Sequence, residues 1–486
     1  MHLSHTSERP KIIVLDDDPT GSQTVHSCLL LMQWDVDTLR IGLQDVSPIV
    51  FILTNTRSRS PHQAEQVTRE VCRNLKQAIA LESIQNFLLV SRSDSTLRGH
   101  YPLETDTIAD ELGPFDAHFL VPAFFEGGRF TRASIHYVQS QDNQGHVIET
   151  PVHETEFARD AAFPFSHSFL PSYVAEKTGG AIAPSSVHRL LTSDLKKGCV
   201  DQLLQFEQNQ CVAVDGETQA DLDQFATDCL TAVSQGKRFL FRSAASLLTS
   251  LTQLPPQSVA PEASGHYTRN HQPGIVLVGS YVSKTTEQLQ VLLQQPHVTG
   301  VEINIRALLD HPILMSPALT DTVENNATQI HQHLLADTLH QIRTAHKSGD
   351  GVVVYTSREE VSLDHPEQRL QFSQTVAALL IDIVQGLPST IGFLISKGGI
   401  TSNNTLSHGL GLQSVRLLGQ ILPGCCLVCT ESSHPYFPHL PVVLFPGNVG
   451  NADSLAIAYQ RLSPELPRDR LTTARDNSYS ERKSHH

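Results

Sequence analysis

The chain has 486 residues, more than one hydrophobic core usually supports, so two domains are expected. Acidic residues outnumber basic residues by 50 to 35, and this excess of negative charge argues against a basic nucleic-acid-binding surface. No run of 18 or more apolar residues occurs, so the sequence predicts no membrane-spanning helix.

Short apolar runs that end in polar or Gly-rich loops recur through the first half of the chain. Residues 1–10 precede them as a loose polar arm without the apolar stretch of a secretory signal. The runs lie at 12–21, 51–58, 88–99 and 119–129, and each is typical of a buried strand followed by a loop. Two amphipathic helices are predicted between and after them, at 62–80 with Val67, Val71 and Leu75 on one face, and at 218–236 with Leu222, Phe225, Cys229 and Val233.

The second half repeats this arrangement after a stretch without apolar periodicity. Residues 252–273 are rich in Pro, Ser and Gln, and we interpret them as a linker between domains at 11–251 and 274–462. Further strand-and-loop runs lie at 275–280, 301–305, 353–360, 393–402 and 442–450, with a long amphipathic helix at 327–349. The polar residues 463–486 are predicted to be a disordered tail.

Strands that alternate with helices predict the α/β class with mainly parallel sheets. In such sheets ligands bind beyond the carboxyl ends of the strands, where the loops converge. We therefore expect two α/β domains, each with its own set of ligand-binding loops, and an active-site cleft between the domains.

Eight cysteines are scattered along the chain, and Cys426 and Cys429 form a CxxC pair inside an apolar run. A structural zinc site of this kind needs a second pair, which is missing, so buried reduced thiols are the better interpretation. Reduced thiols and the absence of a signal sequence predict a cytoplasmic protein.

One set of loops, at 16–21, 91–100 and 124–129, combines acids with arginines, and we call it the acid–arginine loops. Three consecutive aspartates at a strand end can accept a proton from a substrate hydroxyl, although a solvated turn is the alternative. The arginines of the second and third loops suit the binding of a carboxylate or phosphate. The alternative for the second loop is a structural salt bridge, and the alternative for the third loop is a tight turn. For Arg57 and Arg59, a place on the charged surface is at least as good an interpretation as a role in ligand binding.

A second set, at 279–280, 356–357, 396–402 and 446–450, is rich in Gly, Ser and Thr, and we call it the glycine–serine loops. Backbone N–H groups at such turns bind phosphate oxygens, especially where a helix begins. Two motifs do not match known fingerprints. GSYVSKT has Ser283 where a Walker A motif has its second glycine, and HGLGLQS has Ser414 where a dinucleotide motif has Gly or Ala.

These motifs together resemble those of the four-carbon acid sugar kinases. IIVLDDDPTGSQTVH, SRSDSTLRGHYPLE, VPAFFEGGRFT and FRSAAS resemble the N-terminal domain of that family, and GSYVSKTTEQL, SKGGITSN and PGNVGNADSL resemble its nucleotide-binding domain. The resemblance spans residues 11–461 in the expected order. It implies an enzyme that uses ATP to phosphorylate an acid such as threonate, erythronate or a 3-oxo-tetronate. An extra Asp and Pro19 in the first loop, and Arg92 where many members have lysine, leave the exact acid open.

The resemblance also implies individual site residues. For the sugar acid these are Asp16, Asp17, Thr20, Gly21, Arg92, Asp94, Ser95, Arg98 and Gly99, to which the loop patterns add Asp18, Glu126 and Arg129. For ATP they are Ser280, Gly398, Gly399, Thr401, Gly447 and Gly450, to which the loop patterns add Thr356, Ser357 and Asn448. Asp17 is the favoured catalytic base, with Asp16 beside it and Asp18 as the alternative. ATP and Mg²⁺ are the expected cofactors, and no metal ligand is assigned.

Two other classes of function stay open at this point. The first is a non-catalytic sensor of a sugar acid or nucleotide, which would need only one of the two loop sets. The second is a metal-dependent hydrolase or lyase of phosphorylated sugar acids, which would leave the glycine–serine loops without a role. The expected partners are a small sugar acid and ATP, with no nucleic acid or membrane, and a homodimer is considered as the assembly.

Overall fold

The computed structural model describes residues 9–141, 145–280, 282–308, 321–358, 366–447 and 449–464. In the first half the strands are β1 (Lys11–Asp16), β2 (Leu29–Leu31), β3 (Ile49–Leu53), β4 (Phe87–Arg92), β5 (Ala117–Val121), β6 (Arg129–Arg132), β7 (Ile135–Gln141), β8 (Val147–Pro151), β9 (His188–Leu190), β10 (Gln210–Val214) and β11 (Phe239–Ser243). The helices of this half are α1 (Val36–Gln44), α2 (Pro61–Leu81), α3 (Leu103–Leu112), α4 (Leu170–Lys177), α5 (Thr192–Leu195), α6 (Val200–Gln205), α7 (Gln219–Ser234) and α8 (Ala245–Thr252).

In the second half the strands are β12 (Ile275–Val278), β13 (Val298–Ile303), β14 (Gly351–Thr356), β15 (Leu394–Lys397), β16 (Ser414–Leu422), β17 (Cys425–Cys429) and β18 (Pro441–Phe445). The helices are α9 (Ser283–Leu293), α10 (Asp321–Lys347), α11 (Pro366–Gln385), α12 (Gly399–Asn404) and α13 (Ser454–Leu462). Each strand predicted from an apolar run is present, and both halves belong to the predicted α/β class.

Two of the predicted helices combine an N-terminal cap with an apolar face that packs into the core. Ser60 caps α2 and is bonded reciprocally to Gln63, and Pro61 occupies the first turn, where it needs no N–H partner. The face of α2 that carries Val67 and Val71 is buried. Thr218 caps α7 in the same reciprocal way. The helix predicted at 327–349 corresponds to α10, which begins earlier, at Asp321, and ends at Lys347.

Helices cover both faces of each half of the main sheet. On β1, Ile12 and Val14 pack into the cluster that includes residues of α7 and α8, while Ile13 and Leu15 pack with residues of α2 and α3. This alternation follows from the two-residue period of a strand. In the second half α10 and α11 contribute to one cluster, and α9 and α13 contribute to the cluster on the opposite face. The hydrophobic core therefore lies in two layers, one on each side of the sheet.

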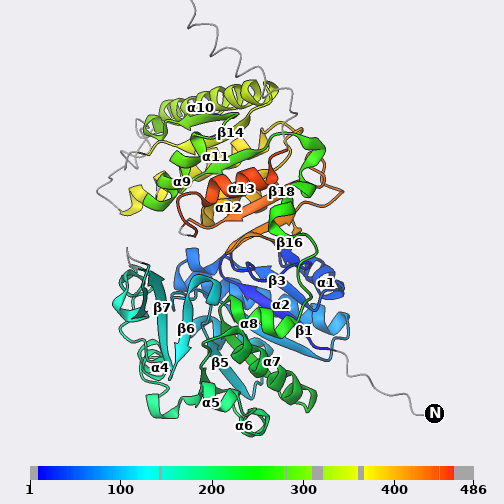
Figure 1. Cartoon of the computed structure of the whole chain (residues 1–486), viewed down its shortest axis with the longest axis vertical. Coiled ribbons are helices and arrows are strands. Elements are labelled where there is room, and N and C mark those ends of the chain that lie inside the picture. The colour runs from blue at the N-terminus through cyan, green and yellow to red at the C-terminus, as the bar shows by residue number, and fades with distance from the viewer. Residues whose placement is uncertain are drawn as a thin grey trace, which may run out of the picture.

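A single fifteen-stranded sheet runs through both halves of the described chain, in the order β13-β14-β12-β15-β18-β17-β16-β2-β3-β1-β4-β11-β5-β10-β9. Most neighbouring strands are parallel, as predicted. The exceptions lie at the centre, where β17 pairs antiparallel with β18, and β16 pairs antiparallel with both β17 and β2. The pairing of β2 with β16 joins the two domains by main-chain hydrogen bonds, and β16 lies between the two lobes in Figure 1.

Several elements were not predicted from the sequence, among them β2, β9, β10, β11, β16 and β17. Strands β6, β7 and β8 form a small antiparallel sheet of their own in the first domain. Part of the predicted linker forms a short 3₁₀ helix, Pro261–Tyr267, which lies against the second domain through an ion pair of 2.6 Å between Glu262 and Arg461. The domain boundaries stay a prediction, and residues 465–486 of the predicted tail lie outside the described residues.

None of the helices in the described part of the chain combines the length and the apolar character that crossing a bilayer requires. All eight cysteines are free thiols, and all except Cys429 are buried, which agrees with their interpretation as reduced core residues.

Candidate active site

The acid–arginine loops meet at the carboxyl end of β1. Asp16 is the last residue of this strand, whose neighbours in the sheet are β3 and β4. Its carboxylate packs against Gly21, where an added Cβ would lie 2.1 Å from Oδ1 of Asp16. Position 21 therefore needs a glycine, because any side chain there would displace the carboxylate.

Asp16 is fully buried and incompletely paired. Its Oδ1 lies 3.4 Å from Nη1 of Arg92, while its Oδ2 is buried without a hydrogen-bond partner among the described residues. Burial raises the pKa of Asp16 to about 7, although the positive charge of Arg92 opposes the rise. Asp16 is thus a carboxyl group that can change its protonation state near neutral pH.

Asp17 is held by the protein at both carboxylate oxygens. Arg57 donates to Oδ1 from Nη2 at 2.5 Å and to Oδ2 from Nε at 3.1 Å. The hydroxyl of Ser93 donates to Oδ2 at 2.7 Å. Such bidentate pairing fixes the geometry of the loop and leaves little room for Asp17 to bind a ligand.

Asp18 is the most exposed of the three aspartates, with 21% of its side chain accessible. Its Oδ1 accepts hydrogen bonds from the backbone N–H and the hydroxyl of Thr20, and its Oδ2 lies 3.4 Å from Nη1 of Arg57. Burial would raise the pKa of Asp18, but Arg57 and Thr20 outweigh burial and hold the pKa below its usual value. Asp18 is therefore ionised at neutral pH and partly accessible.

Arg57 bridges Asp17 and Asp18 from the turn after β3. Only 19% of its side chain is exposed, so its interpretation as surface charge is wrong. The sequence could not reveal this contact, because about forty residues separate the arginine from its partners.

The second acid–arginine loop follows β4 and is built around Asp94. Arg98 donates to Oδ2 of Asp94 from Nε at 2.6 Å, and the hydroxyl of Thr96 donates to the same oxygen. Burial alone would raise the pKa of Asp94, but Arg57 and Arg98 hold it well below its usual range. The backbone carbonyl of Ser95 contacts Nε2 of His136 at 2.7 Å.

Gly99 closes this loop in a conformation that only glycine adopts readily. Its φ is +125°, and an added Cβ would lie 2.4 Å from Oγ of Ser93. The same Cβ would lie 3.2 Å from Oδ2 of Asp17. The second loop therefore packs directly on the aspartate loop, as the sequence analysis predicts.

Arg98 and Arg129 lie over the same aromatic ring. Their guanidinium carbons are 5.1 Å and 5.9 Å from the ring centroid of Phe157. Arg98 also lies 3.4 Å from Asp160, whereas Nε of Arg129 is buried and has no hydrogen-bond partner in the part of the chain that the structure describes. The pair is thus suited to an anion that would satisfy the remaining donor of Arg129.

Glu126 lies at the junction of the domains. Its Oε2 accepts a hydrogen bond of 2.7 Å from Nε2 of Gln420 in β16. Burial raises the pKa of Glu126, and the bond from Gln420 opposes that rise. Its assignment to the sugar-acid site stays a prediction.

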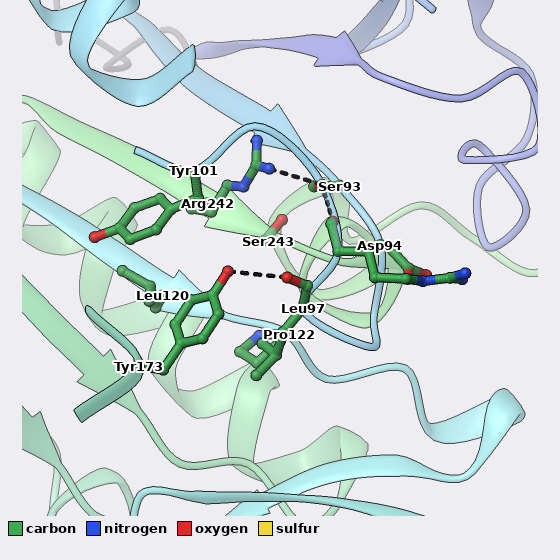
Figure 2. A pocket seen from close by; sticks show the side chains of 10 residues that line it. Ser93, Asp94, Leu97, Tyr101, Leu120, Pro122, Tyr173, Arg242 and Ser243 are labelled. Atoms are coloured by element: carbon green, nitrogen blue, oxygen red, sulfur yellow. Dashed lines mark hydrogen bonds and ion pairs between the residues drawn. The ribbon is translucent and has the colours of Figure 1, made fainter. Parts of the chain in front are cut away.

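A small pocket lies at the ends of β4, β5 and β11, beside the second acid–arginine loop (Figure 2). It is lined by Ser93, Asp94, Leu97, Arg98, Tyr101, Leu120, Pro122, Tyr173, Arg242 and Ser243. Arg242 donates to Oγ of Ser93 at 2.8 Å, and the hydroxyl of Tyr173 donates to the backbone of Leu97 at 2.9 Å, as Figure 2 shows. The hydroxyl of Ser243 is buried and has no hydrogen-bond partner within the described ranges. Arg242 and Ser243 were not assigned from the sequence, although the FRSAAS motif contains both.

Three of the glycine–serine loops converge at the ends of the adjacent strands β12, β15 and β18. A Cβ added to Gly398 would lie 3.2 Å from Cβ of Ser280 and 3.2 Å from Oγ1 of Thr401. One added to Gly447 would lie 3.2 Å from Oγ of Ser280. Gly398 has a φ of +121°, which favours glycine, and it immediately precedes α12. The predicted phosphate residues are therefore brought together.

The remaining predicted nucleotide residues border this cluster. Thr356 ends β14, the neighbour of β12, and the hydroxyl of Ser357 accepts a bond from the backbone of Ile305 at 3.3 Å. Arg358 links this loop to the cluster by donating to the carbonyl of Ser280 at 2.8 Å. Gly450 has a φ of +82°, while Asn448 lies outside the described residues.

The two loop sets meet at one point. A Cβ added to Gly399, the first residue of α12, would lie 3.5 Å from Oδ2 of Asp18. The partly accessible carboxylate of Asp18 in the first domain thus lies beside the Gly398–Gly399 turn of the second domain. Within the described residues, no three His, Cys, Asp or Glu side chains are grouped to hold a metal ion.

Comparison with known proteins agrees with this division. The chain matches a sugar-binding N-terminal domain over residues 12–251 and a nucleotide-binding C-terminal domain over residues 275–455. A D-erythronate kinase of Heliobacterium modesticaldum is 23% identical over 463 residues, which cover 91% of this chain and 95% of the relative.

Two crystal structures share the fold. A Haemophilus influenzae protein superposes with a TM-score of 0.59 at 16% identity and covers 93% of this chain and 100% of its own. A protein of Salmonella typhimurium LT2 does so with a TM-score of 0.65 at 16% identity and covers 94% of this chain and 99% of its own. Because both domain types occur in this order over most of its length, the chain belongs to the four-carbon acid sugar kinase family.

Proposed function

We propose that the chain is an ATP-dependent kinase that phosphorylates a hydroxyl of a four-carbon sugar acid, such as an erythronate, a threonate or a 3-oxo-tetronate. The observation that carries this proposal is the contact between Asp18 and the Gly399 turn. Phosphoryl transfer needs the acceptor hydroxyl and the terminal phosphate to meet in line, and the two loop sets meet at this contact. The similarity to a D-erythronate kinase supports the same class of substrate.

The carboxylate of the acid would bind to Arg98 and Arg129. A planar guanidinium forms two parallel hydrogen bonds to a carboxylate, and none of the described residues bonds to Nε of Arg129. The hydroxyls of the acid would then extend towards the aspartates, where Asp18 is the partly accessible carboxylate.

Asp18 is the residue that we propose as proton acceptor. In the reaction a bond forms between the substrate hydroxyl oxygen and the γ-phosphorus, the bond from that phosphorus to the β–γ bridging oxygen breaks, and ADP leaves. The hydroxyl proton passes to the carboxylate of Asp18. Asp17, the base favoured by the sequence, holds Arg57 with both oxygens and so orients Asp18.

The nucleotide phosphates would bind to the turn formed by Ser280, Gly398, Thr401 and Gly447. Backbone N–H groups at the start of α12 and the two hydroxyls supply the donors. Mg²⁺ usually binds through substrate phosphates and one or two carboxylates, which fits a site without a ready-made protein cluster. When bound, Mg²⁺ would neutralise charge that develops on the phosphates.

The direct test is ADP release from Mg²⁺-ATP with a panel of tetronates, together with phosphorus NMR of the product. We expect one acid to stimulate ADP release, with one phosphorylated acid formed for each ADP. Binding of an acid without any ADP release would favour the sensor. Release of inorganic phosphate from a phosphorylated acid, without transfer from ATP, would favour the hydrolase.

A further inference from the structure

Lys397, the last residue of β15, is a buried cation directly before the Gly398–Gly399 turn. Its side chain is fully buried, with an exposed fraction of 0%. Lysine is almost never buried to this extent unless a partner or a function compensates. The proposed reaction does not yet give this residue a role.

The ammonium of Lys397 contacts the segment that follows β18. Nζ donates to the backbone carbonyls of Pro446 at 2.6 Å and of Gly447 at 3.2 Å, and it lies 4.2 Å from the ring centroid of Phe445. The C=O and N–H of a trans peptide point in opposite directions. Because Lys397 binds the carbonyl of Pro446, the N–H of Gly447 points away from the lysine. Lys397 thereby fixes the orientation of the Pro446–Gly447 turn.

The positive charge of Lys397 has no counter-ion in the described part of the chain. No carboxylate forms an ion pair with it there, and the titratable groups that face it are Cys425 of β17 and Lys284 of α9. Burial raises the pKa of Cys425 well above its usual range, so this thiol is neutral. Lys284 repels the charge. Burial accordingly lowers the pKa of Lys397 to about 7.

We propose that Lys397 is a positioning residue of the nucleotide site, which holds the Pro446–Gly447 turn and supplies a buried positive charge that the phosphates of the bound nucleotide neutralise. This inference rests on the proposed function, since it takes a nucleoside phosphate as the ligand of the turn. Lys397 would therefore affect nucleotide binding without touching the nucleotide, by holding the Pro446–Gly447 turn and by the electric field of its charge.

A consequence for protons follows from the missing counter-ion. The free protein at pH 8 would hold Lys397 largely neutral, because this pH lies above the depressed pKa. Bound phosphates favour the ammonium form and raise that pKa, so nucleotide binding at pH 8 takes up a proton. At pH 6 Lys397 already carries its proton, and binding takes up none at this site.

The test is calorimetric titration of the full chain with ADP, without sugar acid, in two buffers of different ionisation enthalpy at pH 8 and pH 6. Lys397→Met removes the charge, Lys397→Arg retains it, and Lys347→Met removes an exposed charge at the end of α10 as a matched control. We expect Lys397→Met to bind ADP roughly 10- to 100-fold more weakly, since charged hydrogen bonds have such effects. We also expect wild type, but not Lys397→Met, to take up protons at pH 8.

Comparison of wild type with Lys397→Met at each pH cancels the titration of ADP itself. Weaker binding with unchanged proton uptake would reduce Lys397 to a structural residue and overturn the proposal, as would unchanged ADP affinity in Lys397→Met. If that variant fails to fold, Lys397→Arg must retain affinity yet lose the proton uptake at pH 8, and uptake that persists would overturn the proposal. Wild-type protein that binds no ADP would instead overturn the proposed function.

Discussion

Asp18 in the loop after β1 and Gly399 at the start of α12 come from different domains, yet a Cβ on Gly399 would lie 3.5 Å from the Asp18 carboxylate. This contact places Asp18 of the acid–arginine loops beside the Gly398–Gly399 turn of the glycine–serine loops. It defines where the proposed acceptor hydroxyl and terminal phosphate would meet.

The contact makes Asp18→Asn the sharpest test of the proposed base. We expect kcat to fall by about 10²–10⁴, the usual effect of losing a general base, while ADP affinity stays unchanged. Steady-state kinetics and calorimetry measure the two effects separately. Asp17→Asn should instead lower the thermal stability, because it breaks the bidentate pair with Arg57. A folded Asp17→Asn variant without activity, beside an active Asp18→Asn variant, would return the role of base to Asp17.

Gly399→Val should block the space between the two loop sets. The nearest atom to the new Cβ is at an ordinary van der Waals distance, so the fold should survive. We expect at least about tenfold weaker ADP binding, because glycine permits close approach of the backbone to a phosphate. Gly399→Ala should have a smaller effect in the same titration. Unchanged nucleotide affinity in folded Gly399→Val would show that the phosphates bind elsewhere.

Arg98→Lys and Arg129→Lys should each raise KM for the acid. Lysine keeps the charge but loses the planar fork, and loss of a charge-assisted bond costs about 1.5–3 kcal/mol. KM for ATP should stay constant. Arg132→Lys is the matched control, since Arg132 lies on the same strand β6 but pairs with Glu149 and Glu217. A wild-type KM for the acid in both variants would remove these arginines from the carboxylate site.

Asp16→Asn should change how stability depends on pH. The folded carboxyl titrates near 7 and the unfolded one near 3.8, so the native state binds more protons between these values. The contribution of Asp16 to wild-type stability therefore falls as pH rises from about 4 to 7 and levels off above 7. The variant lacks this loss, so its stability relative to wild type should be greater at pH 8 than at pH 5. Urea denaturation at both pH values measures the difference, and equal differences would contradict the raised pKa.

Local patterns made nine of the eighteen described strands and three helices predictable. The run that ends in Asp16 forms β1 because its apolar residues are continuous, and α2 forms because its cap and apolar face coincide. Strands β6 to β8 were missed, since β8 is exposed at three of its five residues and carries no apolar run.

The site was predictable where a loop carries its own chemistry and unpredictable where partners are distant. The aspartates and the glycine turns follow strands directly, so the sequence indicates them. Arg57 is separated from Asp17 by forty residues. Lys397 binds backbone carbonyls, and because every residue has one, the residue types do not reveal such a contact. Such contacts depend on tertiary packing, and a single sequence does not encode them in a local pattern.

The pairing of β2 with β16 determines how the chain can be divided. A fragment that stops at residue 251 would keep β2 and lose its antiparallel partner, so Leu29, Leu30 and Leu31 would form a bare sheet edge. An exposed apolar edge is a template for strands of other molecules, and such a fragment is expected to aggregate. The boundary between the two domains along the chain is therefore not a boundary between independently folding units, and expression of either domain alone would need a substitute strand.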